Sequence, residues 1–280
     1  MMMNDKKQNV QVDCASDDVV LIITACIQPN QNQRYLALKD VSERLRQYVA
    51  CIEYYISDSP FYHIVFCDNS DYNVPETSAL IQSARDKGKN LEMLRFMGNS
   101  ELVAKYSTKG IGEDEIMDYV LTNSVLTSRA KMLFKVTGRL LVTNLQRLVK
   151  GVCYGKNYFL RDMYSDSYSL DTRFFAVDMD CYNRTMRRCY ERVNDYDMSY
   201  ERVFYLLLGE NRLPLCRYPR FVGCSSGVGT NYGAEPKLKL GILDVLCRWG
   251  AFNHSCCFIP LLYTNILLRK AGTLFHRMKR

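Results

Sequence analysis

A lysine and an arginine bracket a Thr-Gly turn at the end of an apolar run, and this stretch is the most informative in the sequence. Two cations placed so closely can neutralise a diphosphate, and a glycine lets a ligand approach the backbone. The alternative is a solvated turn that carries two surface bases. The stretch reads Phe134-Lys135-Val136-Thr137-Gly138-Arg139.

Polar or small residues also follow two earlier apolar runs. Thr24 and Ala25 end the run that starts at Val19, and a nucleotide base or ribose fits over such small side chains. Asp68 and Asn69 follow the second run, where a carboxylate can accept hydrogen bonds from a base N–H or from ribose hydroxyls. The alternatives are an ordinary loop at the first place and a turn or helix cap at the second.

Three groups of charged residues in the second half have both a chemical and a structural interpretation. Asp178 and Asp180 form a D-x-D, which can bridge Mg²⁺ or Mn²⁺ to a diphosphate, or can mark a strand end followed by a helix cap. Glu201 can act as a general base, or can simply complement a helix dipole. Asp171 and Arg173 can contact a ligand, or can form an internal ion pair.

Apolar runs and helical periodicities alternate along the first half of the chain. Continuous apolar runs indicate strands covered on both faces, and apolar residues at helical spacing indicate the helices between them. The pattern predicts an α/β fold: a doubly wound, mostly parallel sheet with helices on both faces. Strands are predicted over 19–26, 61–67, 91–96 and 131–136, helices over 33–57, 76–87 and 113–129, and a polar Gly-rich loop over 109–112.

Ligands of such sheets bind beyond the carboxyl ends of the strands, so Thr24, Asp68 and Thr137 are expected at one common edge. The second half mixes further elements with the same pattern. Strands are predicted over 157–162 and 172–177, a helical stretch over 180–193, a helix capped by Ser199, and a small-residue loop over 221–229.

The positive charge is concentrated at one end of the chain. Residues 237–280 hold eight bases and one acid, whereas residues 1–236 hold 29 of each, so the whole net charge of +7 lies in the last 44 residues. A neutral body with a basic, partly apolar tail favours an anionic membrane surface over nucleic acid as a partner. The alternative is a last helix packed on the domain.

Composition narrows the class of protein further. The 280 residues include no run of the roughly 18 charge-free apolar residues that a spanning helix needs, and the polar start lacks the apolar core of a signal peptide. The twelve cysteines include no C-x-x-C pair, which favours reduced thiols over a zinc site or a disulfide framework. We therefore expect a cytoplasmic protein.

The order of these motifs over residues 18–210 resembles the A-type (GT-A) glycosyltransferases of bacterial surface polysaccharide synthesis, which make capsule, O-antigen and lipopolysaccharide. Residues 20–25 and 64–70 look like the first two nucleotide-binding strands, and Lys109 to Asn123 resembles the segment that leads to the usual D-x-D. At that place the chain has Lys135 to Arg139, similar to a subset with a K-x-T-G-R-like sequence. Asp178 and Asp180 come about 40 residues later in the chain than the position of the usual D-x-D.

The resemblance implies transfer of a sugar from a nucleotide donor, a UDP-sugar above all, to a hydroxyl of a lipid-linked or growing glycan, with inversion. It implies Glu201 as the base and Asp171 and Arg173 as acceptor or donor contacts. Cations would replace a metal at the diphosphate, with Mg²⁺ or Mn²⁺ at Asp178 and Asp180 as the alternative. The implied donor-binding residues are Thr24, Ala25, Asp68, Asn69, Lys109, Lys135, Thr137, Gly138 and Arg139.

On this interpretation residues 1–236 form the catalytic domain, with a nucleotide-binding half over about 18–145 and an acceptor half over about 146–236. Residues 237–280 form a helical, basic, amphipathic segment that holds the protein on the inner face of the cytoplasmic membrane. Two other functions stay open: a sugar nucleotidyltransferase, and a non-catalytic scaffold at a membrane surface.

Overall fold

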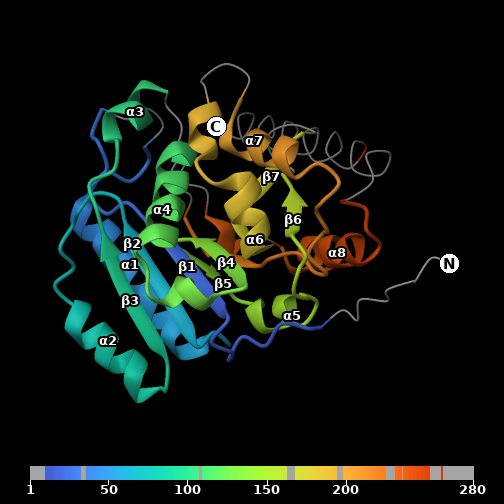
Figure 1. Cartoon of the computed structure of the whole chain (residues 1–280), viewed down its shortest axis with the longest axis horizontal. Coiled ribbons are helices and arrows are strands. Elements are labelled where there is room, and N and C mark those ends of the chain that lie inside the picture. Colours follow the sequence, from blue (N-terminus) through green and yellow to red (C-terminus); the bar gives the residue numbers. More distant parts are fainter. Residues whose placement is uncertain are drawn as a thin grey trace, which may run out of the picture.

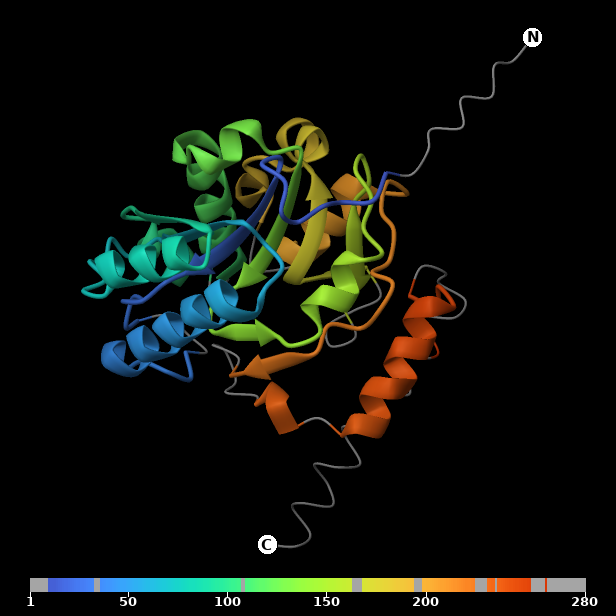
Figure 2. The same cartoon turned by 90° about the horizontal axis from the view of Figure 1, so that it is seen from below.

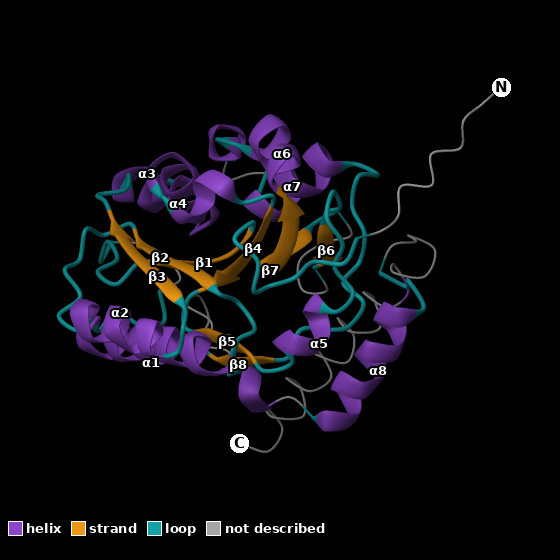
Figure 3. Ribbon diagram, turned by 60° about the horizontal axis from the view of Figure 1, so that its bottom comes forward, coloured by secondary structure: helices purple, strands orange, loops and turns teal. Residues whose placement is uncertain are grey.

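A six-stranded sheet forms the centre of the computed structural model, with helices on both of its faces (Figures 1 and 3). The structure describes residues 10–32, 36–106, 109–162, 168–193, 198–224, 231–234, 236–252 and 260. The strand order is β3-β2-β1-β4-β7-β6. The strands are β1 (Val19–Ala25), β2 (His63–Asp68), β3 (Asn90–Arg95), β4 (Met132–Thr137), β6 (Tyr158–Arg161) and β7 (Leu170–Asp178).

The four strands β3, β2, β1 and β4 are parallel, and β7 runs antiparallel to both of its neighbours. Every residue of β1 and β2 is buried, as the continuous apolar runs predicted for strands covered on both faces. The α/β class and the mostly parallel sheet with helices on both faces are therefore confirmed.

Helices α1 (Val41–Asp58) and α2 (Thr77–Asp86) cover one face of the sheet, while α4 (Lys109–Asn123) and α7 (Tyr200–Leu208) cover the other (Figure 3). Each face has its own apolar core: Ile52 and Phe66 belong to the first, and Met117 and Phe204 to the second. Ser199 caps α7 as predicted, since its side chain accepts a hydrogen bond from the Arg202 backbone N–H.

Several element boundaries differ from the sequence prediction. Helix α1 begins at Val41, after the cap Asp40, rather than at residue 33, and residues 33–35 lie outside the described residues. The predicted Gly-rich loop 109–112 is instead the first turn of α4. That helix ends at Asn123, and a separate 3-10 helix, η1 (Leu126–Arg129), follows it.

The second half contains more short elements than the periodicity indicated. Residues 179–192 break into α6 (Met179–Cys181), a π-turn (Tyr182–Met186) and a 3-10 turn (Cys189–Arg192). A two-stranded sheet pairs β5 (Leu140–Val142) with β8 (Phe221–Gly223), which the sequence analysis assigned to a loop. The short helices α3 (Ser100–Lys105) and α5 (Leu145–Val149) were also missed.

Helix α8 (Lys237–Arg248) forms most of the described part of the predicted basic segment, and it packs on the domain. Its Asp244 accepts hydrogen bonds from the Tyr218 backbone N–H (3.0 Å) and from Arg220 Nη2 (2.9 Å). The alternative of a last helix packed on the domain therefore holds for these residues. Among the helices of the described ranges, none is long and apolar enough to span a bilayer.

Parallel pairing decides which side chains share an edge of the sheet. Thr24 lies opposite Cys67 on β2 and opposite Thr137 on β4, and Ala25 lies opposite Asp68. The predicted meeting of these strand ends is thus confirmed.

Candidate functional site

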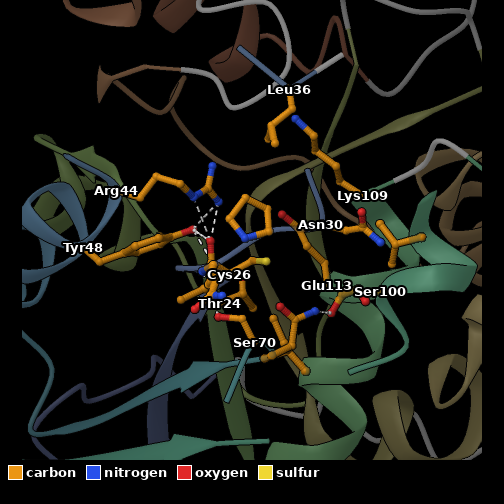
Figure 4. Close-up of a pocket in the computed structure, with 18 of the residues that line it drawn as sticks. Thr24, Cys26, Asn30, Leu36, Arg44, Tyr48, Ser70, Ser100, Lys109 and Glu113 are labelled. Carbon is orange, nitrogen blue, oxygen red and sulfur yellow. Dashed lines mark hydrogen bonds between the residues drawn. The ribbon is translucent and has the colours of Figure 1, made fainter. Parts of the chain in front are cut away.

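A cavity of about 620 Å³ lies beyond the carboxyl ends of β1, β2 and β4 (Figure 4). Its walls come from the loops after β1 and β2, the starts of α1 and α4, helix α3 and the turn after β4. Seven of the nine predicted donor-binding residues line it: Thr24, Ala25, Asn69, Lys109, Thr137, Gly138 and Arg139.

Arg44 contributes a cation that the sequence analysis did not identify. Its side chain is 3% exposed, and its Nε donates to the carbonyl oxygens of Cys26 (3.0 Å) and Ile27 (3.2 Å). Figure 4 shows Arg44 beside Tyr48 and Cys26, and the Tyr48 hydroxyl accepts a hydrogen bond from the Cys26 N–H (3.0 Å). The arginine therefore fixes the loop after β1 and adds positive charge to the cavity wall.

Arg139 and Lys109 add two more cations. Arg139 has a left-handed backbone (φ 69°), donates from Nη1 to Gln47 Oε1 (3.2 Å) and places its guanidinium 5.5 Å from the centre of the Tyr48 ring. Burial, together with the nearby charges of Arg44 and Arg139, lowers the pKa of Lys109 to about 8. The three cations repel one another, and the nearby Glu113 offsets this repulsion only in part, so a bound anion would stabilise them further.

Buried polar atoms at this cavity also lack partners within the part of the chain that the structure describes. Thr24 Oγ1, Arg139 Nε and Asn69 Oδ1 have no hydrogen-bond partner there, and Thr24 and Arg139 are only 3% and 6% exposed. A buried polar atom without a partner costs about 1–3 kcal/mol. These atoms therefore have unused hydrogen-bonding capacity at the edge of the cavity.

Asp68 lies at this edge but does not line the cavity. Its fully buried carboxylate accepts hydrogen bonds from the backbone N–H groups of Ile27 (2.7 Å), Ser70 (2.9 Å) and Tyr72 (3.0 Å). Burial raises its pKa, against these hydrogen bonds. The structure thus shows the cap-like alternative: Asp68 shapes two loops of the wall and has no free face for a nucleoside.

Lys135 is likewise buried, beneath the cavity rather than in its lining. Its Nζ donates to Glu113 Oε2 (2.6 Å), Thr137 Oγ1 (2.8 Å) and the Thr172 carbonyl oxygen (2.8 Å). With its ammonium fully occupied, Lys135 does not reach a diphosphate directly. Glu113 does line the cavity, and the sequence analysis did not identify it as a site residue.

Gly138 is required for close packing as well as for the approach of a ligand. A Cβ at this position would lie 2.5 Å from the Thr24 carbonyl oxygen and 2.6 Å from the Tyr48 ring. The turn after β4 can therefore approach β1 and α1 only if this residue is glycine, and that approach brings Arg139 to the cavity.

Glu201 lies outside the cavity lining, in the first turn of α7, and its side chain is half-buried. Burial, together with the nearby acids Asp162 and Glu113, raises its pKa to about 7. The preceding Tyr200 contacts Gly110, in the first turn of α4, where an added Cβ would fall 2.1 Å from the Tyr200 Cβ. Glu201 is thus placed on the α4 side of the cavity.

Asp171 and Arg173 form the internal ion pair that the sequence left open. Arg173 Nε donates to Asp171 Oδ1 (2.8 Å), and its guanidinium lies 4.5 Å from the centre of the Phe221 ring and 4.8 Å from that of Tyr232. Although burial opposes the shift, the Asp171 carboxylate, together with Tyr218 and Tyr232, raises the pKa of Arg173 well above its usual range. Neither residue lines the cavity.

The alternative metal site at Asp178 and Asp180 is wrong for this cavity. Because β7 is antiparallel to β4, Asp178 lies opposite Met132, at the edge of the sheet away from Thr137. Its side chain accepts a hydrogen bond from the Cys181 N–H (3.0 Å) and caps α6. Asp180 is exposed and faces Arg184, at 3.8 Å.

The donor set at the cavity does not fit a divalent cation. Its two carboxylates are Glu113, which binds Lys135, and Asp71, which lies 3.6 Å from Arg95. The described residues contain no group of three or more His, Cys, Asp or Glu side chains arranged as metal ligands. Arg44, Lys109 and Arg139 instead provide positive charge from the protein itself.

No family model and no curated protein matches the chain. Among solved structures, the mannosyltransferase Ktr4p from S. cerevisiae aligns at 12% identity and a TM-score of 0.44, over 86% of this chain and 83% of that one. The complex of the same protein with GDP aligns at 11% identity and a TM-score of 0.45, over 91% of this chain and 88% of that one. HddC from Yersinia pseudotuberculosis aligns at 10% identity and a TM-score of 0.33, over 73% of this chain and 92% of that one.

Proposed function

We propose that the cavity binds a nucleoside-diphosphate sugar, a UDP-sugar above all, and that the protein transfers the sugar to a hydroxyl group. The observation that carries this proposal is the cavity of about 620 Å³ at the strand ends, whose wall holds Arg44, Lys109 and Arg139. Its volume suits a ligand of this size, and three cations match the charge of a diphosphate. The order of motifs that resembles GT-A glycosyltransferases supports the same function.

In this proposal each part of the cavity has a distinct task. Arg139 and Lys109 hold the diphosphate and stabilise it as negative charge develops on the leaving group. Thr24 and Asn69 hydrogen-bond the nucleoside. Lys135 acts as a positioning residue, because its bonds to Glu113 and Thr137 join the start of α4 to the end of β4.

Glu201 is proposed as the general base. An acceptor that enters between the cavity and α7 brings its hydroxyl to this carboxylate, which removes the proton while the hydroxyl oxygen attacks the anomeric carbon. The bond from that carbon to the diphosphate breaks on the opposite side, so the configuration inverts. A lipid-linked or growing bacterial glycan as acceptor, at the inner face of the cytoplasmic membrane, is part of this proposal.

Titration calorimetry with UDP, GDP, CMP and ADP, each with Mn²⁺ and with EDTA, tests the donor site. We expect one nucleotide to bind with EDTA present, and Arg139→Ala to weaken binding at least about tenfold, since charge-assisted hydrogen bonds to a phosphate are lost. Arg184→Ala is the matched control, because it removes the same charge from an exposed site near Asp180.

Other outcomes would point elsewhere. Binding of no nucleotide contradicts the proposal and favours the scaffold. Binding only with Mn²⁺ contradicts the cationic diphosphate site. If the protein instead joins a nucleoside triphosphate to a sugar 1-phosphate and releases pyrophosphate, it is a nucleotidyltransferase.

A further inference from the structure

Helix α8 has a second apolar face, directed away from the domain. Leu238, Ile242 and Trp249 are 77%, 53% and 79% exposed. At about 100° per residue, these three side chains lie within about 40° of one another around the helix axis. Figure 2 shows α8, the long orange-red helix, at the periphery of the molecule.

The orientation of α8 is fixed by its opposite face. Leu243, Asp244 and Cys247 are buried, and Asp244 is held by Tyr218 and Arg220. Because this face already packs on the domain, the opposite face of the helix remains exposed to solvent. An exposed apolar stripe of this kind marks an interaction surface rather than scattered surface residues.

The charges beside the stripe indicate the chemistry of the partner. Lys237 and Arg248 lie on one side of it and Lys239 on the other, each about 80–100° from Leu238 around the helix. Bases that flank an apolar stripe are typical of helices that lie in the interface of an anionic bilayer. Trp249 adds an aromatic ring of the kind that is enriched at the headgroup level.

Two other occupants are disfavoured by the same charges. A second copy of the chain would bring the bases of two α8 helices together. Residues 253–280 would add five bases and no acid to the surface that they covered. Like charges repel in both cases, whereas acidic headgroups complement the stripe.

We propose that α8 binds anionic membranes through the face formed by Leu238, Ile242 and Trp249. The charge of residues 237–280 predicted an anionic membrane as the partner. The present proposal assigns the contact with it to one face of one helix. It lies apart from the cavity and does not depend on the proposed glycosyl transfer, so the two proposals are tested separately.

The single tryptophan of the chain, Trp249, reports on this face directly. In the free protein we expect its fluorescence to be quenched by iodide, as for a solvated indole. Vesicles of equal parts phosphatidylcholine and phosphatidylglycerol should shift the emission to shorter wavelength and protect it from iodide. Vesicles of phosphatidylcholine alone should do neither.

Variants then identify the face that binds. The double variant Leu238→Ser/Ile242→Ser should weaken binding to the anionic vesicles at least about tenfold, because two apolar side chains leave the interface. The variant Lys237→Gln/Lys239→Gln should weaken it by a similar factor and make it less sensitive to salt. Leu206→Ser, at an exposed leucine on α7, is the matched control and should change nothing.

Three results would overturn the proposal. In the first, the anionic vesicles leave the fluorescence unchanged. In the second, Trp249 is already protected from iodide in the free protein, so another part of the chain or a second copy covers the face. In the third, the double serine variant binds as tightly as the parent, so the remaining basic residues carry the interaction.

Discussion

The cations of the cavity differ in how completely the protein already uses them. Lys135 is neutralised by Glu113 and hydrogen-bonded by Thr137 and the Thr172 carbonyl, so it stabilises the site from below. Arg139 keeps one buried N–H without a partner among the described residues. Of the two cations in the Lys-x-Thr-Gly-Arg stretch, the arginine is therefore the one poised to bind a ligand.

Thr24→Val tests whether the cavity is built for a hydrogen-bonding ligand. Valine has the shape of threonine, and Thr24 Oγ1 has no partner among the described residues. We expect the free energy of unfolding of the ligand-free protein to stay the same or rise slightly, because a buried unpaired hydroxyl is removed. Nucleotide affinity should fall about fivefold. Urea unfolding and calorimetry measure the two effects, and unchanged affinity would exclude Thr24 from the binding site.

The ionisation of Glu201 predicts the pH dependence of turnover. Its pKa is raised to about 7, and a general base acts only when it is deprotonated. Turnover should therefore rise as the pH increases through about 7 and then level off. Glu201→Gln should reduce turnover at least about 100-fold and abolish this rise. Release of nucleoside diphosphate measures the rate. Near-normal turnover in the variant would show that another group, or none, acts as base.

At the level of elements, the close contact between α4 and α7 positions the cavity wall. Gly110 lies directly against Tyr200, and buried Asp114 of α4 accepts hydrogen bonds from the Tyr182 hydroxyl (3.1 Å) and the Tyr190 N–H (2.9 Å). These contacts hold helix α4 in place, so Lys109 in its first turn and Glu113 just after that turn have fixed positions.

Gly110→Ala should separate these elements. The added Cβ would meet the Tyr200 Cβ at 2.1 Å, and overpacking of this kind costs about 1–3 kcal/mol. We expect a lower free energy of unfolding in urea and weaker nucleotide binding, because α4 carries Lys109. Gly241→Ala in α8 is the matched control, since nothing lies within 4 Å of its added Cβ. It should stabilise the chain by about 0.5–1 kcal/mol. Equal effects of the two substitutions would show that the α4–α7 contact is unimportant.

At the scale of the whole molecule, the cavity joins segments that are far apart in the sequence. Its wall includes Thr24, Arg44, Asn69, Lys109 and Arg139, which come from both faces and from the edge of the sheet. A ligand that contacts all of them must stabilise the fold as a unit.

Thermal unfolding with the bound nucleotide tests this coupling and the role of metal together. A ligand at a hundredfold excess over its Kd stabilises a protein by about 2.7 kcal/mol, which raises Tm by roughly 5 °C in a chain of this size. We expect the same rise with EDTA as with Mn²⁺, and no rise in Arg139→Ala. A rise that requires Mn²⁺ would contradict the interpretation of the cavity as a metal-free diphosphate site.

The sequence by itself determined the α/β class, the four parallel strands and their common edge. Each of these follows from local patterns: apolar runs form buried strands, and parallel strands place their carboxyl ends together. The Thr-Gly turn and Arg139 were found in the same way, since they directly follow a strand.

The tertiary structure decided which of these residues face the cavity. Lys135 and Asp68 are residues of types that often bind ligands. In this structure, however, their polar atoms are occupied by hydrogen bonds to residues distant in the sequence, such as the bond from Lys135 to Glu113. Arg44 lies in the cavity wall only because α1 begins beside the end of β1. The antiparallel direction of β7 placed Asp178 away from the site, and the mixed pattern of the second half did not indicate that direction. Long-range pairing, rather than local propensity, thus assembled the site.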